Sequence, residues 1–294
     1  MVVKVRGKGL PTQYLFSAAG IGFILVTGGL MVHATVFGET VTSCAARFPK
    51  AAEFALARRS GQLVTTSEMQ AGLAGNDWGL LENGNVLKVG GGPAVAALSV
   101  KLAAGGSDGG RIDNPVSGIG FNWTPRVLKT TSVACLGYDV LLPEGFEFGN
   151  GGTLPGLFGG DPDAPTLDGT RGYFATPLRW LPGGKLEVRP QTYDHPAGVS
   201  WLIDKNWLEL PRGRWFRLEQ EVALNTPGYA DGRVRVFVDG QLRGEAKGLG
   251  FRKDDKLGFV GVVANTHYGS LAGGWQPAPK ASEIRLSPFV VHWK

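Results

Sequence analysis

The side chains best suited to chemistry lie in the run KLEVRPQTY, residues 185–193. Successive side chains of a β-strand point to opposite faces, so Leu186 and Val188 share one face of this run. The opposite face carries the polar and aromatic side chains, which are Lys185, Glu187, Arg189, Gln191 and Tyr193. An arginine can pair with a carboxylate through two parallel hydrogen bonds, and a tyrosine beside a cation can act as an acid or a base. This face therefore carries side chains that could meet an acidic ligand, and an ordinary solvated sheet face is the alternative.

A neighbouring run, RGYFATPLRW at residues 171–180, divides its faces in the same way. Phe174, Leu178 and Trp180 are expected in the core. The outward positions are then Arg171, Tyr173, Ala175, Pro177 and Arg179. Aromatic rings that stack on sugars and cations that pair with carboxylates are typical of a cleft for an acidic sugar polymer. A solvated sheet face has a similar pattern, so both interpretations stay open at this point.

Two histidines, His195 and His267, lie near these runs or near the strands that follow them. An imidazole can transfer protons near neutral pH, although a single histidine is commonly a hydrogen-bonded structural residue. His267 is retained as a candidate ligand of the substrate.

Other kinds of site lack their residues. The glycine-rich run GGTLPGLFGG, residues 151–160, is not followed by the lysine of a phosphate-binding loop. No cysteine–histidine cluster has zinc spacing, and the acidic run DPDAPTLDG, residues 161–169, lacks the spacing of an EF-hand. Glycoside hydrolysis requires two carboxylates on one cleft face, and Glu187 is the single acid that can be placed there. We expect no metal and no organic cofactor.

Composition and patterning indicate β structure. The chain of 294 residues contains 46 glycines and 18 prolines, and 43% of its residues are hydrophobic. From about Asn85 onward, short alternating runs are separated by turn residues; examples are RWFRLEQEVAL, RVRVFVDGQLRG, KLGFVGVVANTHYG and SEIRLSPFVV. Such runs predict an all-β fold, a two-sheet antiparallel β-jelly roll or concanavalin-like sandwich. Asp239 and Gly240 in the run VDGQ predict a two-residue hairpin turn.

The jelly-roll domain is expected to span residues 85–294, preceded by a linker at residues 38–84. Within the linker, residues 44–75 are rich in alanine and place several apolar side chains at roughly helical spacing. We expect a short helical segment in this linker.

The N-terminal segment, residues 1–37, has the pattern of a membrane-targeting helix. Lys4, Arg6 and Lys8 precede residues 15–37, which contain no Asp, Glu, Lys or Arg. As a helix this run would be roughly 35 Å long, enough to cross a hydrocarbon core of about 30 Å. The basic residues should stay on the cytoplasmic side, so the rest of the chain is expected to be exported. Two alternatives remain, a retained inner-membrane anchor with the domain facing the periplasm or the outside, and a cleaved signal peptide with a secreted domain.

The globular part carries little net charge. The whole chain has a formal charge of +5, and three of its basic residues lie in the N-terminal segment. The remaining surplus, about +2, gives no reason to expect a nucleic-acid partner. We expect a monomer. Cys44 and Cys135 are too few for a disulfide scaffold or a zinc cluster, but export would permit a disulfide between them.

Longer motifs resemble a known family. The run YDVLLPEGFEFGNGGTLPGLFGG, residues 138–160, is followed by YFATPLRW and KLEV. This order resembles the alginate and glucuronan lyase type of β-jelly-roll polysaccharide lyase. The upstream runs VLKVGGGPA and GIGFNW agree with it, as do the downstream run NTHYGS, Trp275 and the closing strand at residues 282–291. The resemblance covers about residues 85–294 and implies a jelly-roll fold with an acidic polysaccharide as partner.

The resemblance also implies a reaction. Members of this family cut uronic-acid polymers by β-elimination: the sugar carboxylate is neutralised, the C5 proton is removed and the leaving oxygen is protonated. The family's lysine corresponds to Thr153, and its serine and arginine correspond to Ala175 and Pro177. Its two tyrosines correspond to Arg189 and Gln191. Each of these positions therefore carries a side chain other than the one the family uses.

Two functional hypotheses follow. In the first, the chain is an exported polysaccharide-lyase-like protein that acts on an acidic polysaccharide, by β-elimination if it is active. In the second, it is a non-catalytic polysaccharide-binding or exopolysaccharide-processing protein that kept the cleft. The loss of a general acid–base group typically lowers a rate by about 10²–10⁴-fold, so the family's own mechanism is not expected here. The residues expected to bind the polymer are Arg189, Gln191, Tyr193, Tyr173, Arg179 and His267.

Overall fold

The computed structural model describes residues 43–73, 77–107, 116–128, 131–161, 172–193, 195, 198–203, 209–269 and 277–294. The chain divides into two units, residues 1–40 and residues 41–294, and the first unit lies outside the described residues. The predicted signal or transmembrane helix at residues 1–37 therefore lies outside them as well. Among the described residues, no helix has both the length and the apolar character needed to cross a membrane.

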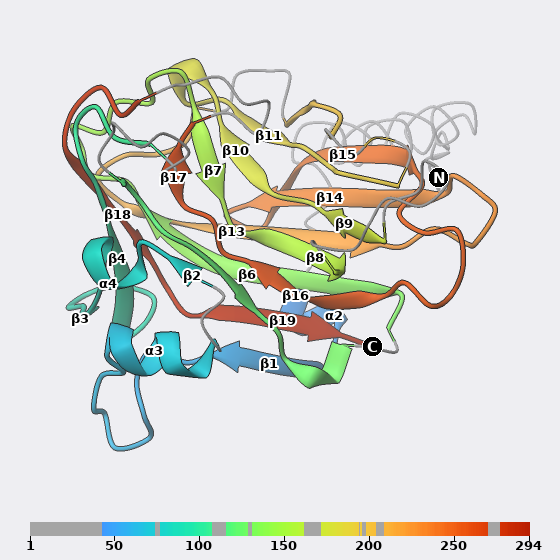
Figure 1. Ribbon diagram of the computed structural model, residues 1–294, viewed down its shortest axis with the longest axis horizontal. Coiled ribbons are helices and arrows are strands. Elements are labelled where there is room, and N and C mark those ends of the chain that lie inside the picture. Colours follow the sequence, from blue (N-terminus) through green and yellow to red (C-terminus); the bar gives the residue numbers. More distant parts are fainter. Residues whose placement is uncertain are drawn as a thin grey trace, which may run out of the picture. The chain divides into compact units, whose positions relative to one another are not determined.

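A large antiparallel sheet forms one layer of the second unit (Figure 1). Its main order is β15-β14-β13-β6-β18-β4-β3, and β19 lies between β6 and β1. The strands are β1 (Lys50–Phe54), β3 (Gly84–Lys88), β4 (Ala96–Leu102), β6 (Val133–Leu141), β13 (Trp215–Ala223), β14 (Gly232–Val238), β15 (Gln241–Leu249), β18 (Ser282–Leu286) and β19 (Phe289–Trp293). Asp239 and Gly240, with φ angles of 50° and 75°, form the two-residue turn between β14 and β15, as the sequence predicts.

Two shorter antiparallel sheets, ordered β12-β11-β10-β7-β17 and β2-β5-β16-β8-β9, together form the second layer. Their strands are β2 (Asp77–Trp78), β5 (Gly120–Trp123), β7 (Gly152–Leu154), β8 (Gly156–Gly160), β9 (Tyr173–Ala175), β10 (Leu178–Trp180), β11 (Leu186–Val188), β12 (Trp201–Ile203), β16 (Phe259–Val263) and β17 (His267–Tyr268). The chain passes directly from one sheet to the other between β7 and β8 and between β9 and β10, with a change of direction at each passage (Figure 1). We call these two sheets the bent layer.

The core lies between the bent layer and the large sheet. The bent layer contributes alternate side chains to it, including Leu154, Leu178 and Trp180, all at most 1% exposed. The large sheet contributes Leu218 and Val222, among other side chains of β6, β13 and β14. Alternation of this kind is what buries one face of each sheet of a sandwich. The predicted all-β antiparallel sandwich is confirmed.

The bend coincides with prolines. Pro155 follows β7, Pro177 precedes β10 and Pro190 follows β11. A proline has no N–H group to donate to a strand ladder. Tyr138 of β6 reaches across the core, and its hydroxyl donates to the carbonyl of Pro155 at 2.9 Å.

Gln220 of β13 supplies further partners at the bend. Its Oε1 accepts from the backbone N–H of Leu157 at 3.1 Å and from the hydroxyl of Thr176 at 2.9 Å. Its Nε2 donates to the carbonyl of Thr176 at 2.6 Å. Gln220 is fully buried, so these bonds satisfy backbone groups that the interrupted ladder leaves open.

Residues 43–84, which the sequence suggested as a linker, pack on the same core. They carry α2 (Cys44–Arg47), β1, α3 (Thr66–Gly72) and α4 (Leu80–Asn83), and β1 pairs with β19 along its length. Leu56, Met69 and Leu80 belong to the main hydrophobic cluster. This segment thus completes the domain rather than preceding it, because its apolar side chains cover an end of the sandwich core.

A disulfide joins Cys44 of α2 to Cys135 of β6, with 5.7 Å between the two Cα atoms. The two cysteines have a sequence separation of 91, so the disulfide closes a long loop of the chain.

Candidate functional site

A row of polar side chains crosses the outer face of the bent layer. Arg179 of β10 is paired in register with Glu187 of β11 and with Thr153 of β7. Thr153 is also paired with His267 of β17. All four point away from the core, because their strand neighbours point into it. The strand parity predicted this face for the residues of β10 and β11, and the structure places them there.

Arg179 and Glu187 form a buried ion pair within this polar row. Arg179 Nη1 lies 2.8 Å from Glu187 Oε1, and the two side chains are 5% and 3% exposed. Arg179 Nη2 donates to the carbonyl of Gly269 at 3.1 Å, and the hydroxyl of Ser200 donates to Glu187 Oε2. Arg179 was predicted to bind the polymer, but its charge is neutralised within the protein and its surface is buried. The alternation in the sequence places Arg179 and Glu187 on outward faces, but it does not show that the two side chains pair across β10 and β11.

His267 ends the row opposite Thr153. Its Nδ1 lies 2.8 Å from the backbone carbonyl of Tyr268, and because a carbonyl can only accept, Nδ1 carries the proton of the neutral ring. The lone pair is then on Nε2. Trp78 of β2 lies against the imidazole edge-on, with ring centroids 5.4 Å apart. In its neutral form, His267 would therefore have Nε2 as the acceptor atom of the ring.

Two buried polar atoms in the row have no hydrogen-bond partner within the described part of the chain. They are Thr153 Oγ1 and Arg179 Nε, both in side chains of the outer face. Buried polar groups are nearly always hydrogen-bonded. Each of these atoms has less than 1 Å² of exposed surface, so a ligand could bond to them only after neighbouring groups moved.

Beside the polar row, the outer face is apolar. Phe158, Tyr173 and Ala175 form a separate buried cluster, with Val260 and Val263 packed against it. Tyr173 is 8% exposed and Ala175 is 2% exposed, and the rings of Tyr173 and Phe158 are 6.1 Å apart. Tyr173 and Ala175 thus lie on the predicted outward face, but they are buried there, because neighbouring strands pack apolar side chains against them.

The five positions implied by the family resemblance lie on adjacent segments. Thr153 neighbours β10, and the backbone of Ala175 exchanges hydrogen bonds of 3.2 and 2.7 Å with Gln191. The N–H of Arg189 donates to the carbonyl of Pro177 at 3.1 Å. Arg189 and Gln191 are partly exposed, whereas Thr153, Ala175 and Pro177 are buried. The structure therefore brings the five positions together at the bend.

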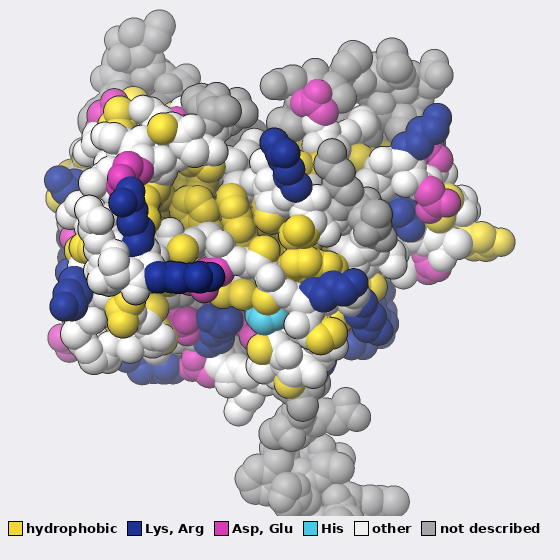
Figure 2. Space-filling model, turned by 90° about the horizontal axis from the view of Figure 1, so that it is seen from below, with side chains coloured by type: hydrophobic (Ala, Val, Ile, Leu, Met, Phe, Trp, Pro, Cys, Tyr) yellow, Lys and Arg dark blue, Asp and Glu magenta, His cyan; other side chains and the backbone are white. Residues whose placement is uncertain are grey.

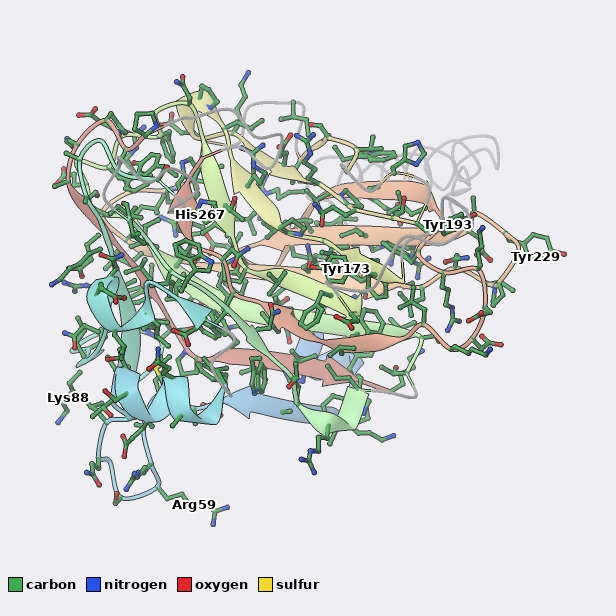
Figure 3. All side chains as sticks on the ribbon, in the orientation of Figure 1. Arg59, Lys88, Tyr173, Tyr193, Tyr229 and His267 are labelled. Carbon is green, nitrogen blue, oxygen red and sulfur yellow. A yellow bond between two sulfur atoms is a disulfide. The ribbon has the colours of Figure 1, made fainter. Side chains whose placement is uncertain are left out.

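Tyr193, two residues beyond Gln191, lies at a pocket of about 340 Å³ at the end of β8 and β9. Lys253 Nζ is 5.6 Å from the centroid of the Tyr193 ring. Figure 3 shows His267, Tyr173 and Tyr193 spread in this order from one side of the molecule toward the other. The predicted ligands of the polymer thus follow the length of the bent layer rather than one point on it.

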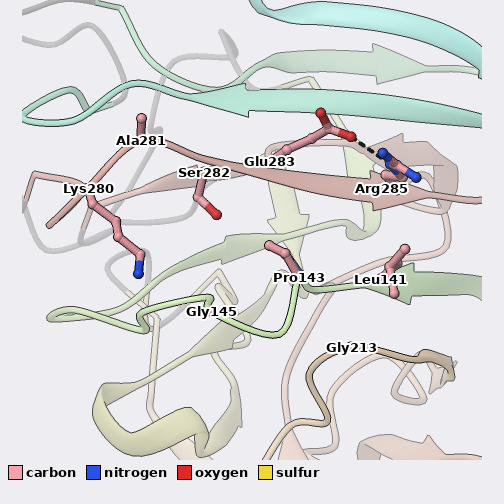
Figure 4. A pocket seen from close by; sticks show the side chains of 9 residues that line it. All are labelled: Leu141, Pro143, Gly145, Gly213, Lys280, Ala281, Ser282, Glu283 and Arg285. Carbon is pink, nitrogen blue, oxygen red and sulfur yellow. Dashed lines mark hydrogen bonds and ion pairs between the residues drawn. The ribbon is translucent and has the colours of Figure 1, made fainter.

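A second pocket, of about 640 Å³, opens where β18 diverges from the end of β6 (Figure 4). Its cations already have acidic partners: Lys280 lies 2.8 Å from Glu147, and Arg285 lies 2.6 Å from Glu283. This pocket belongs to the large sheet and contains none of the predicted site residues.

The surface in Figure 2 is hollowed, with a floor rich in apolar side chains and with Lys and Arg side chains beside it. For metal binding, the described residues contain no group of three or more His, Cys, Asp or Glu side chains that could hold an ion.

Sequence reasoning missed Gln220 and Trp78. Gln220 had a signal, since it falls between Leu218 and Val222 at a position that the alternation of β13 assigns to the core. Trp78 had none, because its contact with His267 joins strands that are distant in the sequence.

The fold is a jelly-roll sandwich with a polar row and an apolar strip on the outer face of its bent layer. A model of the family polysaccharide lyase 14 matches residues 93–284. The chain belongs to the polysaccharide lyase 14 family. The predicted resemblance is thereby confirmed.

Solved structures agree with this assignment. The marine family-14 alginate lyase from Aplysia kurodai is similar with a TM-score of 0.60 and 22% identity, covering 78% of this chain and 94% of that one. The alginate lyase of Chlorella virus has a TM-score of 0.60 and 21% identity, covering 72% and 89%. The endo-β-1,4-glucuronan lyase of Trichoderma reesei has a TM-score of 0.51 and 15% identity, covering 72% and 89%. No curated protein matches the sequence of the chain.

Proposed function

We propose that this chain binds an acidic, uronic-acid polysaccharide along the outer face of the bent layer. The observation that carries the proposal is the gathering of Thr153, Ala175, Gln191 and Arg189 on adjacent strands at the bend. Arg189 is the partly exposed cation of this group, and a guanidinium can bind a carboxylate in a bidentate manner. The similar structures of alginate and glucuronan lyases support a polymer of this chemical class.

The family's own β-elimination has little support in these side chains. Ala175 and Pro177 offer no group that could transfer a proton or pair with a carboxylate, and Thr153 offers only a hydroxyl. Binding without cleavage by the family's residues is therefore the primary proposal.

A rearranged β-elimination is the second candidate, and His267 is the observation that favours it. A base would take the C5 proton, the electron pair would form the C4–C5 double bond, and the C4–O bond would break as the leaving oxygen gains a proton. The lone pair on His267 Nε2, opposite Thr153, could accept the first proton.

One set of measurements tests both. Alginate and polyglucuronate are added to the full chain, binding is measured by calorimetry, and the unsaturated product is followed by its ultraviolet absorbance. Arg189→Ala should weaken binding, whereas Arg59→Ala, an exposed cation far from the bend, should not (Figure 3). Absence of binding to every uronic polymer would refute the proposal. Formation of unsaturated product that His267→Gln abolishes, while binding persists, would establish the second candidate.

Export is also part of the proposal. The charge-free run at residues 15–37 supports it, and so does the disulfide between Cys44 and Cys135, since disulfides persist chiefly in oxidising compartments. Fractionation of cells that express the full chain, with protease added to the outside of spheroplasts, tests this point. A domain protected in the cytoplasmic fraction would refute it.

A further inference from the structure

The pocket beside Tyr193 has the chemistry of an anion site. Its volume is about 340 Å³, and the side chains that line it are those of Tyr193, Lys253, Asp254, Lys256 and Leu257. We propose that this pocket is a distal subsite that binds the carboxylate of a sugar unit beyond those held at the bend. The proposal rests on the function proposed above and names residues that would extend the binding surface.

The lysines of this pocket have no acidic partner within the described part of the chain. The nearby carboxylates are otherwise engaged: Asp254 accepts from the backbone N–H of Lys256 at 2.8 Å, and Asp255 lies 3.5 Å from Arg252. Lys253 contacts the face of the Tyr193 ring instead. The pocket beside β18 differs in this respect, because carboxylates neutralise its cations. Two ammonium groups against the one carboxylate of Asp254 leave this concave surface with a net positive charge, which favours an anionic ligand.

The segment that carries these lysines is anchored by a buried side chain. Asn225, 1% exposed, accepts through Oδ1 from the backbone N–H groups of Phe251 and Arg252 at 2.8 and 2.9 Å. Its Nδ2 donates to the carbonyl of Arg252 at 2.8 Å, and Arg252 Nε donates to the carbonyl of Asn225 at 3.0 Å. These bonds fix the backbone immediately before Lys253. The backbone from which the Lys253 side chain extends is therefore fixed before a ligand binds.

Tyr193 is held by close packing at its other side. A Cβ atom at Gly250 would lie 2.8 Å from Tyr193 Cε1, so the ring passes close to the backbone at this glycine. The phenol is partly exposed and can donate or accept a hydrogen bond. Ring, hydroxyl and two cations are together suited to a sugar that carries a carboxylate.

The pocket continues the surface on which the bend lies. Gly160, which lines it, is paired with Tyr173, and Tyr193 follows Gln191 by two residues. Gly172 also lines the pocket. It lies three residues before Ala175, which is roughly 10 Å of extended chain. A polymer bound at the bend would thus need additional units to reach the pocket. The affinity gained there should depend on chain length.

The test is a length series of oligouronates from alginate, two to eight units long, titrated into the full chain and into the double variant Lys253→Ala/Lys256→Ala. Because an exposed charge pair typically contributes a factor of about 1.5 to 5, we expect the double variant to bind the long oligomers roughly 2- to 25-fold more weakly. Its affinity for the shortest binding oligomers should be unchanged, and its loss of affinity for the long ones should shrink as salt is raised. Tyr193→Phe should show the same length dependence with a smaller loss.

The matched controls are Arg59→Ala/Lys88→Ala, two exposed cations on another part of the domain, and Tyr229→Phe, an exposed phenol (Figure 3). These should bind every oligomer as the unaltered chain does. Unchanged affinity of the lysine variant at all lengths would overturn the subsite while leaving the proposed function intact. An equal loss at all lengths would overturn it too, since the pocket would then be part of the central site. Failure of the unaltered chain to bind any oligomer would overturn both proposals.

Discussion

The buried ion pair between Arg179 and Glu187 allows a sharp prediction about the site. Replacing Glu187 by glutamine removes the negative charge but keeps the shape of the side chain. The guanidinium of Arg179 would then be left in a site where its side chain is 5% exposed, without a compensating charge. Breaking a buried pair in this way typically destabilises a protein by about 3–5 kcal/mol. We therefore expect Glu187→Gln to lower the free energy of unfolding by about that amount.

The assay is urea unfolding of the full chain, followed by the fluorescence of tryptophans such as the fully buried Trp180. Glu283→Gln is the matched control, because its pair with Arg285 is at the surface, with side chains 38% and 39% exposed. Such a pair contributes about 0–1 kcal/mol.

A second variant separates charge from packing. In Arg179→Met/Glu187→Leu, both charges are replaced by apolar groups, and buried pairs replaced in this way are often neutral or stabilising by about 1–4 kcal/mol. A loss below about 1 kcal/mol in Glu187→Gln would refute the reasoning, because water or another anion would then have to reach Arg179. In that case Arg179 would return as a candidate ligand of the polymer.

Three further predictions concern stability. Gln220→Leu should lower the free energy of unfolding by about 2–5 kcal/mol, because buried backbone groups at the bend lose their hydrogen-bond partners. If the urea midpoint decreased by less than it does in a surface Gln→Leu variant, this prediction would be contradicted. Replacing Cys44 and Cys135 by serine should cost about 4 kcal/mol through the larger entropy of the unfolded chain, measured by thermal unfolding, and an unchanged melting temperature would exclude it. Burial and the charge of Arg217 lower the pKa of His292, so the unfolded chain binds a proton there more readily than the folded one. The neutral His292 therefore contributes its full stability above its ordinary pKa of about 6.5, and this contribution is lost as the pH falls below that value. We expect the free energy of unfolding of His292→Gln to change less between pH 7 and pH 5 than that of the unaltered chain, as measured by urea unfolding at each pH.

The sequence predicted the strands well where local rules decide them. The turn at Asp239–Gly240 follows from the positive φ that such residues tolerate, and the alternation at residues 232–236 of β14 follows from the burial of one face. It also predicted which face of β10 and β11 carries Arg179 and Glu187. These features depend on neighbours within one run or one hairpin.

What the sequence could not predict depends on contacts between distant segments. Whether an outward face is wet or buried depends on the strands beside it, so the burial of Tyr173 and Ala175 was not visible in their own run. The same holds for β1, whose partner β19 closes the chain more than 230 residues later. Lys253 and Lys256 had no pattern that distinguished them from other exposed lysines, and only the pocket reveals their relation to Tyr193.

The disulfide sets the route by which tension would enter the domain. Cys44 precedes β1 in the chain, and its bond leads directly to Cys135 in β6. β6 is held along one edge by β13 and along the other by β18 and β19, whereas β1 is paired in the structure with β19. A force applied at Ser43 would therefore pass through the disulfide to β6 and not through β1. β6 can separate from the sheet only if the hydrogen bonds along both of its edges break together. The bent layer contributes no strand to that route, so its outer face would keep its shape while the chain is under load.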